Sequence, residues 1–196
     1  MKLLKSEYST KNAVKDLMQA YLHDMSPYTG ERPDEKGLYS LGKYFDLYWT
    51  DKDRFAYLCL HENEPIGLAL VREITPNQFS ISEFFILRSK RRMGIATHFA
   101  QEVFQQHRGR WSVSQLESNK VAQCFWRRTI SSYTEAHSLK AGHLLNPLDL
   151  SSLSIIVTCN ACLPLFVPAT HSPSIYIDAL FLIFSYAYNS TCAQTC

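Results

Sequence analysis

Apolar side chains recur at helical spacing in two stretches of the first 110 residues. The apolar positions of residues 14–25 and of residues 96–104 follow the i, i+3, i+4, i+7 pattern of an amphipathic helix. Ser9 or Thr10 is available to cap the first helix, and Pro27 is expected to stop it. The pattern therefore predicts two helices, each with one face turned to a core.

Four shorter runs are rich in apolar, β-branched and aromatic residues and predict strands. They cover residues 55–61, 66–72, 79–87 and 111–117. The first two flank a polar turn and are expected to pair as an antiparallel hairpin. Strict alternation in the third would put Phe79, Ile81, Glu83, Phe85 and Leu87 on one face. Glu83 is then a carboxylate on an apolar face.

Two segments complete the expected elements. Residues 28–50 mix glycine and proline with six aromatic residues, which predicts a loop with a short helix. Those aromatic side chains either line a pocket or fill the core, and filling the core is the commoner role. A third main helix is expected after residue 117, with Ser118 or Asn119 as its cap and Trp126 on its apolar face.

Length, charge and the N-terminus narrow the class of protein. The 196 residues suffice for one α/β domain with a full core. A net charge of +2 is too small to indicate a nucleic-acid or anionic-membrane partner. Residues 1–10 lack the apolar run of a secretory signal, so we expect a cytoplasmic protein whose six cysteines are reduced thiols.

Charge is unevenly spread along the chain. Of the 20 Lys and Arg and 18 Asp and Glu residues, only Asp149 and Asp178 follow position 140. We therefore divide the chain into a domain of residues 1–135 and an atypical, cysteine-rich tail of residues 136–196.

The sequence leaves the tail open to several interpretations. It supplies closing strands from residues 153–159 and 174–188, results from a frame shift, or is disordered. A membrane anchor is disfavoured because Asn160, Pro164 and Pro168 interrupt the apolar run. A zinc site at Cys159 and Cys162 is disfavoured by the long apolar stretch before the next cysteine, and we expect no metal.

A short basic turn lies between the third strand and the second helix. Residues 88–96 read Arg-Ser-Lys-Arg-Arg-Met-Gly-Ile-Ala. Free N–H groups and the positive end of the helix dipole favour an anion here, and Gly94 lets a diphosphate approach the backbone. The alternatives are a solvated charged turn and a contact with nucleic acid, which the small net charge disfavours.

These residues resemble the signature of the GNAT acetyltransferases. Arg91, Gly94 and Ala96 match the pattern [QR]-x-x-G-x-[GA] after an apolar strand. A second segment of that family is similar to Asn119, Ala122, Phe125 and Trp126, and the resemblance covers about residues 8–128. It implies a mixed, mostly antiparallel sheet flanked by helices, with the tail departing from the family pattern.

The resemblance also implies a reaction and a set of site residues. Acetyl-CoA would be the co-substrate, and an amine would attack its thioester directly, without an acyl-enzyme. The positions that the resemblance assigns to cofactor binding are Phe85, Ile86, Leu87, Arg91, Arg92, Met93, Gly94, Ile95, Ala96, Asn119 and Phe125. One backbone N–H of Phe84, Phe85 or Ile86 would stabilise the oxyanion.

The acid and the base are chosen from residue chemistry. Glu83 is the predicted base, because an apolar strand face raises a carboxyl pKa toward neutrality; Glu73 and Glu117 are the runners-up. Trp126 stands where the family often has an acidic tyrosine, and an indole N–H is not a useful acid. Tyr133 is the substitute we predict.

The partners follow from this reaction. We expect an amine-bearing small molecule or protein as acceptor, no nucleic acid and no membrane, and we leave open a homodimer. The alternative function is a non-catalytic acyl-CoA-binding or interaction protein built on a degenerate GNAT domain.

Overall fold

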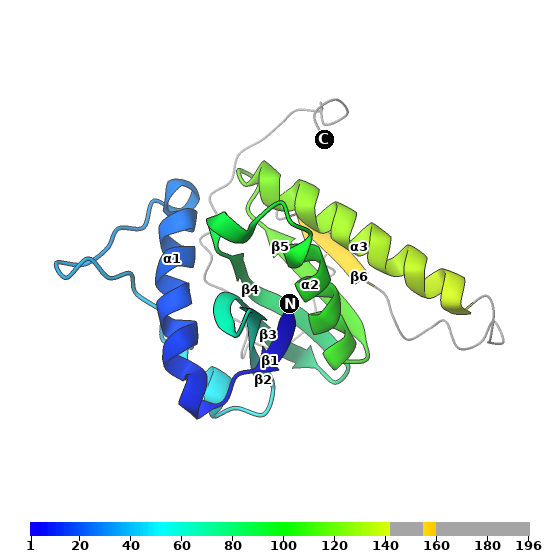
Figure 1. Cartoon of the computed structure of the whole chain (residues 1–196), viewed down its shortest axis with the longest axis horizontal. Helices are drawn as coiled ribbons and strands as arrows, with labels where there is room; N and C mark the ends of the chain where they lie inside the picture. The colour runs from blue at the N-terminus through cyan, green and yellow to red at the C-terminus, as the bar shows by residue number, and fades with distance from the viewer. Residues whose placement is uncertain (142–154, 160–196) are drawn as a thin grey trace, which may run out of the picture. The chain divides into compact units, whose positions relative to one another are not determined.

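The computed structural model describes residues 1–141 and 155–159. The described elements, labelled in Figure 1 except for the 3-10 helices η1–η3, are β1 (Lys2–Lys5), η1 (Tyr8–Thr10), α1 (Lys11–Thr29), η2 (Asp46–Trp49), β2 (Arg54–His61), β3 (Glu64–Thr75), β4 (Gln78–Ile86), η3 (Arg88–Lys90), α2 (Ile95–Gln106), β5 (Arg110–Gln115), α3 (Lys120–Ala141) and β6 (Ile155–Cys159). All the expected helices and strands up to residue 126 are present. Strand β1 was not expected, because four residues are too few for a period to show.

The described strands form one mixed sheet in the order β1-β2-β3-β4-β5-β6. Strands β1 to β4 pair antiparallel, which includes the β2–β3 hairpin that the pattern predicted, whereas β4–β5 and β5–β6 pair parallel. Helix α2 makes the crossover from β4 to β5, since parallel neighbours need a long connection. The expected mixed, mostly antiparallel sheet is confirmed.

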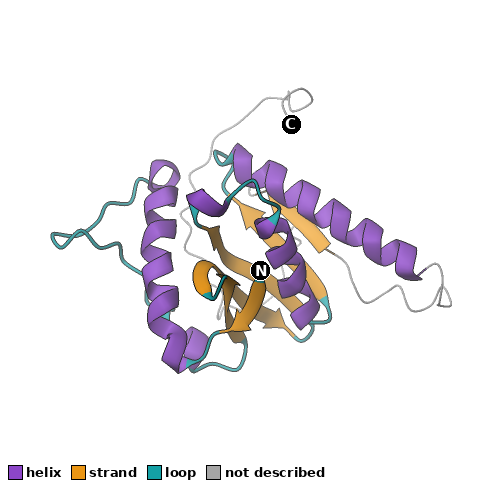
Figure 2. Cartoon of the chain, viewed as in Figure 1, coloured by secondary structure: helices purple, strands orange, loops and turns teal. Residues whose placement is uncertain are grey.

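Helices cover both faces of this sheet (Figure 2). On one face, α1 and η2 bury side chains such as Val14, Met18 and Tyr48 against β2, β3 and the end of β4. On the other face, α2 and α3 pack residues such as Phe99 and Trp126 against the sheet. The fold therefore has three layers with a separate apolar core on each side of the sheet.

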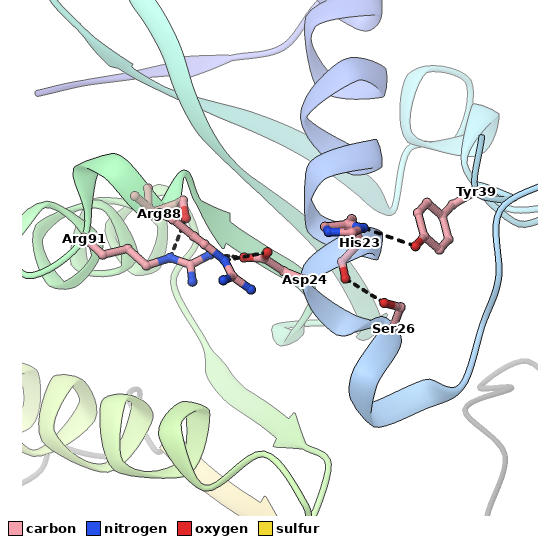
Figure 3. Close-up of polar contacts among 7 residues, drawn as sticks. His23, Asp24, Ser26, Tyr39, Arg88 and Arg91 are labelled. Carbon is pink, nitrogen blue, oxygen red and sulfur yellow. Dashed lines mark hydrogen bonds and ion pairs between the residues drawn. The ribbon is translucent and has the colours of Figure 1, made fainter. Parts of the chain in front are cut away.

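Helix α1 continues past the position where we expected it to stop. Pro27 lies inside the helix, which ends at Thr29 with Gly30 in the left-handed conformation. A proline lacks the N–H that the carbonyl of His23 would accept. The Ser26 hydroxyl donates to that carbonyl instead, at 2.8 Å (Figure 3). The predicted stop was wrong because a neighbouring hydroxyl replaces the missing bond.

The strict alternation expected in β4 is also wrong. Glu83 pairs with Leu70 while Ile81 pairs with Val71, so Ser82 is an extra residue in a β-bulge. Because the bulge shifts the period by one, Phe79 and Ile81 face α2 and α3, whereas Phe85 faces α1. Glu83, two residues before Phe85, lies on the α1 side.

Parts of the expectations for residues 28–50 and for the cysteines are settled here. Phe45 and Tyr48 are buried in the core beneath α1, which supports the core-filling interpretation for them. Cys59 is a free, buried thiol, and the expectation for the other five cysteines stays a prediction.

The described part of the tail begins within a helix. Helix α3 runs across the change in composition at residues 135–141, and β6 forms from the segment expected to supply a strand. The other candidate strand, residues 174–188, lies outside the described residues, and the division at residues 135 and 136 stays a prediction. In the described part of the chain, no helix is long and apolar enough to cross a membrane.

Candidate active site

The basic turn leads into α2 through two residues with positive φ. Arg92 has φ 62° and Gly94 has φ 76°, and Gly94 caps the helix without any side-chain cap bond. The first bond of the helix runs from the His98 N–H to the Gly94 carbonyl, at 3.1 Å. The N–H groups of residues 95–97 therefore have no acceptor within the helix, as at any helix start.

The space in front of this helix start is open. A Cβ atom placed on Gly94 would meet no other group within 4 Å, and Met93 beside it is 60% exposed. No acidic residue lies in the first turn of α2. Unbonded N–H groups, the helix dipole and an accessible glycine together suit an anion such as a diphosphate.

The side chains of two arginines of the turn, Arg88 and Arg91, point to Asp24 on α1 (Figure 3). Arg88 Nε lies 2.7 Å from Asp24 Oδ1, and Arg91 Nη2 lies 2.6 Å from Asp24 Oδ2. Arg91 Nε also donates to the carbonyl of Ile86, at 2.8 Å. The predicted cofactor-binding residue Arg91 thus has its guanidinium bound to protein groups.

Strands β4 and β5 stay paired over only part of their length. Their ladder ends at the pair Ile81 and Val113, next to the bulge, although β4 continues to Ile86. Over residues 83–86, β4 pairs only with β3. The edge of β4 that faces β5 is therefore unpaired in sheet hydrogen bonding beyond the bulge.

The direction of the backbone N–H groups on that edge follows from one bond. The Leu87 N–H donates to the Ile66 carbonyl on the β3 side, at 2.9 Å. Because N–H groups alternate between the two edges of a strand, Phe85 also faces β3, whereas Phe84 and Ile86 face the opening toward β5. Phe84 and Ile86 are the two members of the predicted oxyanion set that face this opening.

Glu83 lies beside this opening, in a strongly desolvating environment. The pKa of its carboxyl is raised to about 7, chiefly because burial disfavours the charged form; hydrogen bonding with Tyr21 lowers the pKa and the negative charge of Glu31 raises it. Its Oε2 atom is shielded from solvent and has no hydrogen-bond partner among the described residues. A carboxyl that titrates near neutrality can accept a proton from an ammonium group.

Tyr21 completes the surroundings of Glu83 from α1. Its ring centroid lies 5.9 Å from that of Phe85, and burial together with the charge of Glu83 raises the pKa of its hydroxyl. The sequence pattern placed Tyr21 on the apolar face of the first helix and gave no sign of its polar contact. This contact depends on the bulge in β4, which the sequence did not predict.

Helix α3 begins on the other side of the opening. Asn119 caps it, with Oδ1 accepting from the Ala122 N–H at 3.0 Å, as its sequence position predicted. Phe125 in the next turn lies 5.7 Å, centroid to centroid, from Phe84. Asn119 and Phe125 are thus brought to the same end of the sheet as the turn before α2.

Tyr133 lies elsewhere on α3. It is buried, with its ring 5.3 Å from that of Phe104 on α2, and burial raises the pKa of its hydroxyl. Fourteen residues separate it from Asn119, which is roughly 20 Å along a helix axis. Its assignment as the acid stays a prediction.

The runner-up carboxylates lie outside this environment. Glu73 accepts the Asn77 N–H in the turn between β3 and β4, at 2.9 Å, and Glu117 is exposed after β5. Among the described residues, no three His, Cys, Asp or Glu side chains come close enough to hold a metal ion. A surface hollow lies at the other end of α1, lined by residues such as Tyr8, Lys11 and Lys15, and is separate from the site.

Comparisons with known proteins agree with this fold. The sequence model of a family described as the acetyltransferase (GNAT) family matches residues 15–130. A search of the curated proteins found no match.

Solved structures show the same fold at low sequence identity. A tetramutant of the BH1408 protein from Bacillus halodurans has a TM-score of 0.54 at 14% identity, covering 65% of this chain and 91% of its own. An aminoglycoside acetyltransferase, meta-AAC0020, from an uncultured soil metagenomic sample has a TM-score of 0.51 at 13% identity, with coverages of 65% and 86%. A GNAT-family acetyltransferase from Staphylococcus aureus Mu50 has a TM-score of 0.50 at 12% identity, with coverages of 65% and 81%.

Proposed function

Since the chain belongs to the GNAT acetyltransferase family, we propose that it transfers an acetyl group from acetyl-CoA to a primary amine by direct attack. The observation that carries this proposal is the position of Glu83. Its carboxyl has a pKa of about 7 and lies where β4 leaves β5, next to an open helix start. A proton acceptor and an anion site then flank one opening.

The donor side is built mainly from backbone groups. The N–H groups of residues 95–97 and the open space at Gly94 suit the diphosphate of acetyl-CoA. Arg92 would add a cation, whereas Arg91 would contribute through the turn it holds and not through its guanidinium. Bound there, acetyl-CoA supplies a thioester whose carbonyl carbon is the electrophile.

The chain's own residues supply the remaining needs of the reaction. Glu83 would take a proton from the ammonium group of the acceptor, directly or through water, and free its lone pair for attack. The N–H of Phe84 or Ile86 would donate to the oxygen that becomes negative. Tyr133 is the predicted proton donor to the leaving thiolate, although a thiolate is stable enough to leave without one.

The acceptor is expected to approach from the α1 side. The negative charge of Glu31 acts on Glu83 there and raises its pKa. Two carboxylates on this side favour a cationic amine over an anionic acceptor. Tyr28, an exposed aromatic residue, lies in the last turn of α1. The similar fold of an aminoglycoside acetyltransferase makes aminoglycosides one class to include in a panel. We place the reaction in the cytoplasm.

The test measures binding first and turnover second. Calorimetry with acetyl-CoA on the full chain should show binding, and thiol release should depend on one or more amines of a panel. Glu83→Gln should lower the rate by about 10²–10⁴-fold with acetyl-CoA affinity kept. Glu62→Gln, an exposed change in the turn between β2 and β3, is the control for charge. A folded chain that does not bind acetyl-CoA would refute the proposal.

The alternative function is a non-catalytic acyl-CoA-binding protein. The observation that favours it is Trp126, which fills the core between α3 and the sheet where the family often has a tyrosine. Binding of acetyl-CoA without thiol release for any amine of the panel would favour this alternative. An unchanged rate in Glu83→Gln would instead remove Glu83 from the mechanism.

A further inference from the structure

One carboxylate on α1 binds two arginines of the basic turn. Asp24 contacts Arg88 and Arg91 through different oxygens, at 2.7 and 2.6 Å (Figure 3). The side chain of Asp24 is only 15% exposed, whereas those of Arg88 and Arg91 are 72% and 42% exposed. Short charge-assisted bonds to a largely buried carboxylate are stronger than exposed ion pairs. We call these three residues the Asp24 latch.

Arg91 is fixed at this place from three sides. Its guanidinium contacts Asp24, donates to the Ile86 carbonyl at the end of β4, and lies 5.4 Å from the ring centroid of Phe85. A planar guanidinium with these contacts has little freedom to turn toward α2. Arg91 therefore joins α1, the end of β4 and the turn that precedes α2.

The neighbours of Asp24 on α1 contact the other walls of the site. Tyr21 and Met25 lie three residues before and one residue after Asp24, on one face of the helix. Tyr21 packs near Phe85, and the sulfur of Met25 lies 3.8 Å from the Asn119 amide nitrogen at the start of α3. One face of α1 thus contacts β4, the basic turn and α3.

We propose that Asp24 is a positioning residue that couples the donor turn, residues 88–94, to the C-terminal half of α1. Arg88 and Arg91 serve this latch and not the phosphates of the donor. The coupling makes the position of Tyr21 beside Glu83 depend on the conformation of the turn. Donor binding, which orders the turn, then also orders the acceptor side. The binding part of this inference rests on the proposed function.

Hydrogen exchange of the α1 amides tests the latch. Asp24→Asn removes the charge and keeps the size, and Arg91→Gln removes the partner. The matched control is Asp16→Asn, on an exposed part of the same helix. Without ligand, exchange in residues 19–29 should rise about tenfold in both latch variants and stay unchanged in the control. Equal exchange in all four proteins would overturn the proposal.

Hydrogen exchange in the presence of acetyl-CoA distinguishes a positioning role of Asp24 from a merely structural one. It should slow exchange of the α1 amides in the wild type and in Asp16→Asn, but not in Asp24→Asn even when this variant is saturated. Equal slowing in Asp24→Asn would overturn the coupling.

Calorimetry tests the proposal independently, through the direction in which Asp24→Asn changes the affinity for acetyl-CoA. Asp24→Asn should weaken acetyl-CoA binding about three- to tenfold, and the double variant Asp24→Asn/Arg91→Gln should bind no more weakly than either single variant. Tighter binding by Asp24→Asn would overturn the proposal, because it would mean that Asp24 competes with phosphate for the arginines. If the wild type binds no acetyl-CoA, the proposed function fails, and the ligand-free exchange still decides whether the latch exists.

Discussion

At residue 83, burial sets both a chemical property and a cost to stability. The pKa of the Glu83 carboxyl is 4.5 in the absence of the fold and about 7 within it. The folded state therefore binds more protons than the unfolded state between these pH values. The contribution of Glu83 to stability is most favourable below pH 4.5, falls as the pH rises to 7, and is constant above it.

Glu83→Gln is expected to be more stable than the wild type at pH 8. The gain should be roughly 1–3 kcal/mol in the free energy of unfolding and should shrink toward pH 5. Urea unfolding at pH 5, 6, 7 and 8 measures it. A gain that is the same at every pH would mean that Glu83 keeps an ordinary pKa.

Arg92 is a second residue at which the effects of a substitution on stability and on acetyl-CoA binding should differ. Its φ of 62° is unfavourable for a side chain with a Cβ atom and is readily adopted by glycine. Arg92→Gly should therefore keep or raise the unfolding midpoint while acetyl-CoA binding weakens about three- to tenfold at low salt. Thermal unfolding and calorimetry at two salt concentrations check both. Unchanged affinity would remove Arg92 from the donor site.

At the scale of elements, β4 owes its shape to a close contact with β3. Gly67 is opposite Ile86, and a Cβ atom at Gly67 would overlap the carbonyl oxygen of Phe85 and the side chain of Ile86. The end of β4 approaches β3 this closely only because residue 67 has no side chain.

Gly67→Ala is expected to push the end of β4 away from β3. The variant should lose about 2 kcal/mol or more of unfolding free energy, because the overlap is with backbone. Acetyl-CoA affinity should fall as well, since Phe84 and Ile86 move with the strand. Urea unfolding and calorimetry measure the two effects. Ala69→Gly, at another β3 position, is the control for a change in stability without this overlap.

Elements with a sustained period could be predicted from the sequence, and their exceptions could not. The α1 and α2 patterns and the β2–β3 hairpin follow from local spacing. The bulge at Ser82 has no local signal, because it is a property of the pairing between β3 and β4. The same holds for Pro27, whose tolerance depends on the Ser26 hydroxyl.

The same limit applies to the site. The turn before α2 was predictable because its chemistry is contained in nine consecutive residues. The Asp24 latch was missed because it joins positions 64 and 67 residues apart, and Asp24 occurs in the sequence as an ordinary helix carboxylate. Glu83 was chosen on a wrong assumption about its strand face, yet desolvation was the right reason for its raised pKa.

At the scale of the whole molecule, His107 joins the ends of several elements away from the site. Its Nε2 atom lies 2.8 Å from the Tyr57 hydroxyl, its ring stacks on Phe79, and the rings of Phe55 and Trp111 lie beside it in tilted contacts. Burial lowers its pKa, the charge of Lys5 lowers it further, and that of Glu73 raises it. The folded state therefore binds fewer protons at this residue than the unfolded state.

The contribution of His107 to the stability of the fold should fall in mild acid for this reason, opposite in sign to that of Glu83. The contribution of neutral His107 is present above about pH 6.5, the unfolded pKa, and is lost as the pH falls toward the folded pKa. His107→Phe keeps an aromatic ring, so its unfolding midpoint should fall less between pH 7.5 and 5.5 than that of the wild type. The exposed His98→Gln is the control. An equal fall in His107→Phe would contradict the assignment.

Helix α3 and strand β6 also decide where the chain can be shortened. A truncation after residue 135, where the composition changes, would cut α3 six residues before its end at Ala141. It would also remove β6, the partner of β5 along residues 111–115. The exposed edge of β5 would then present unpaired N–H and C=O groups to other copies. Such a fragment is expected to aggregate, so expression trials should keep residues 136–159.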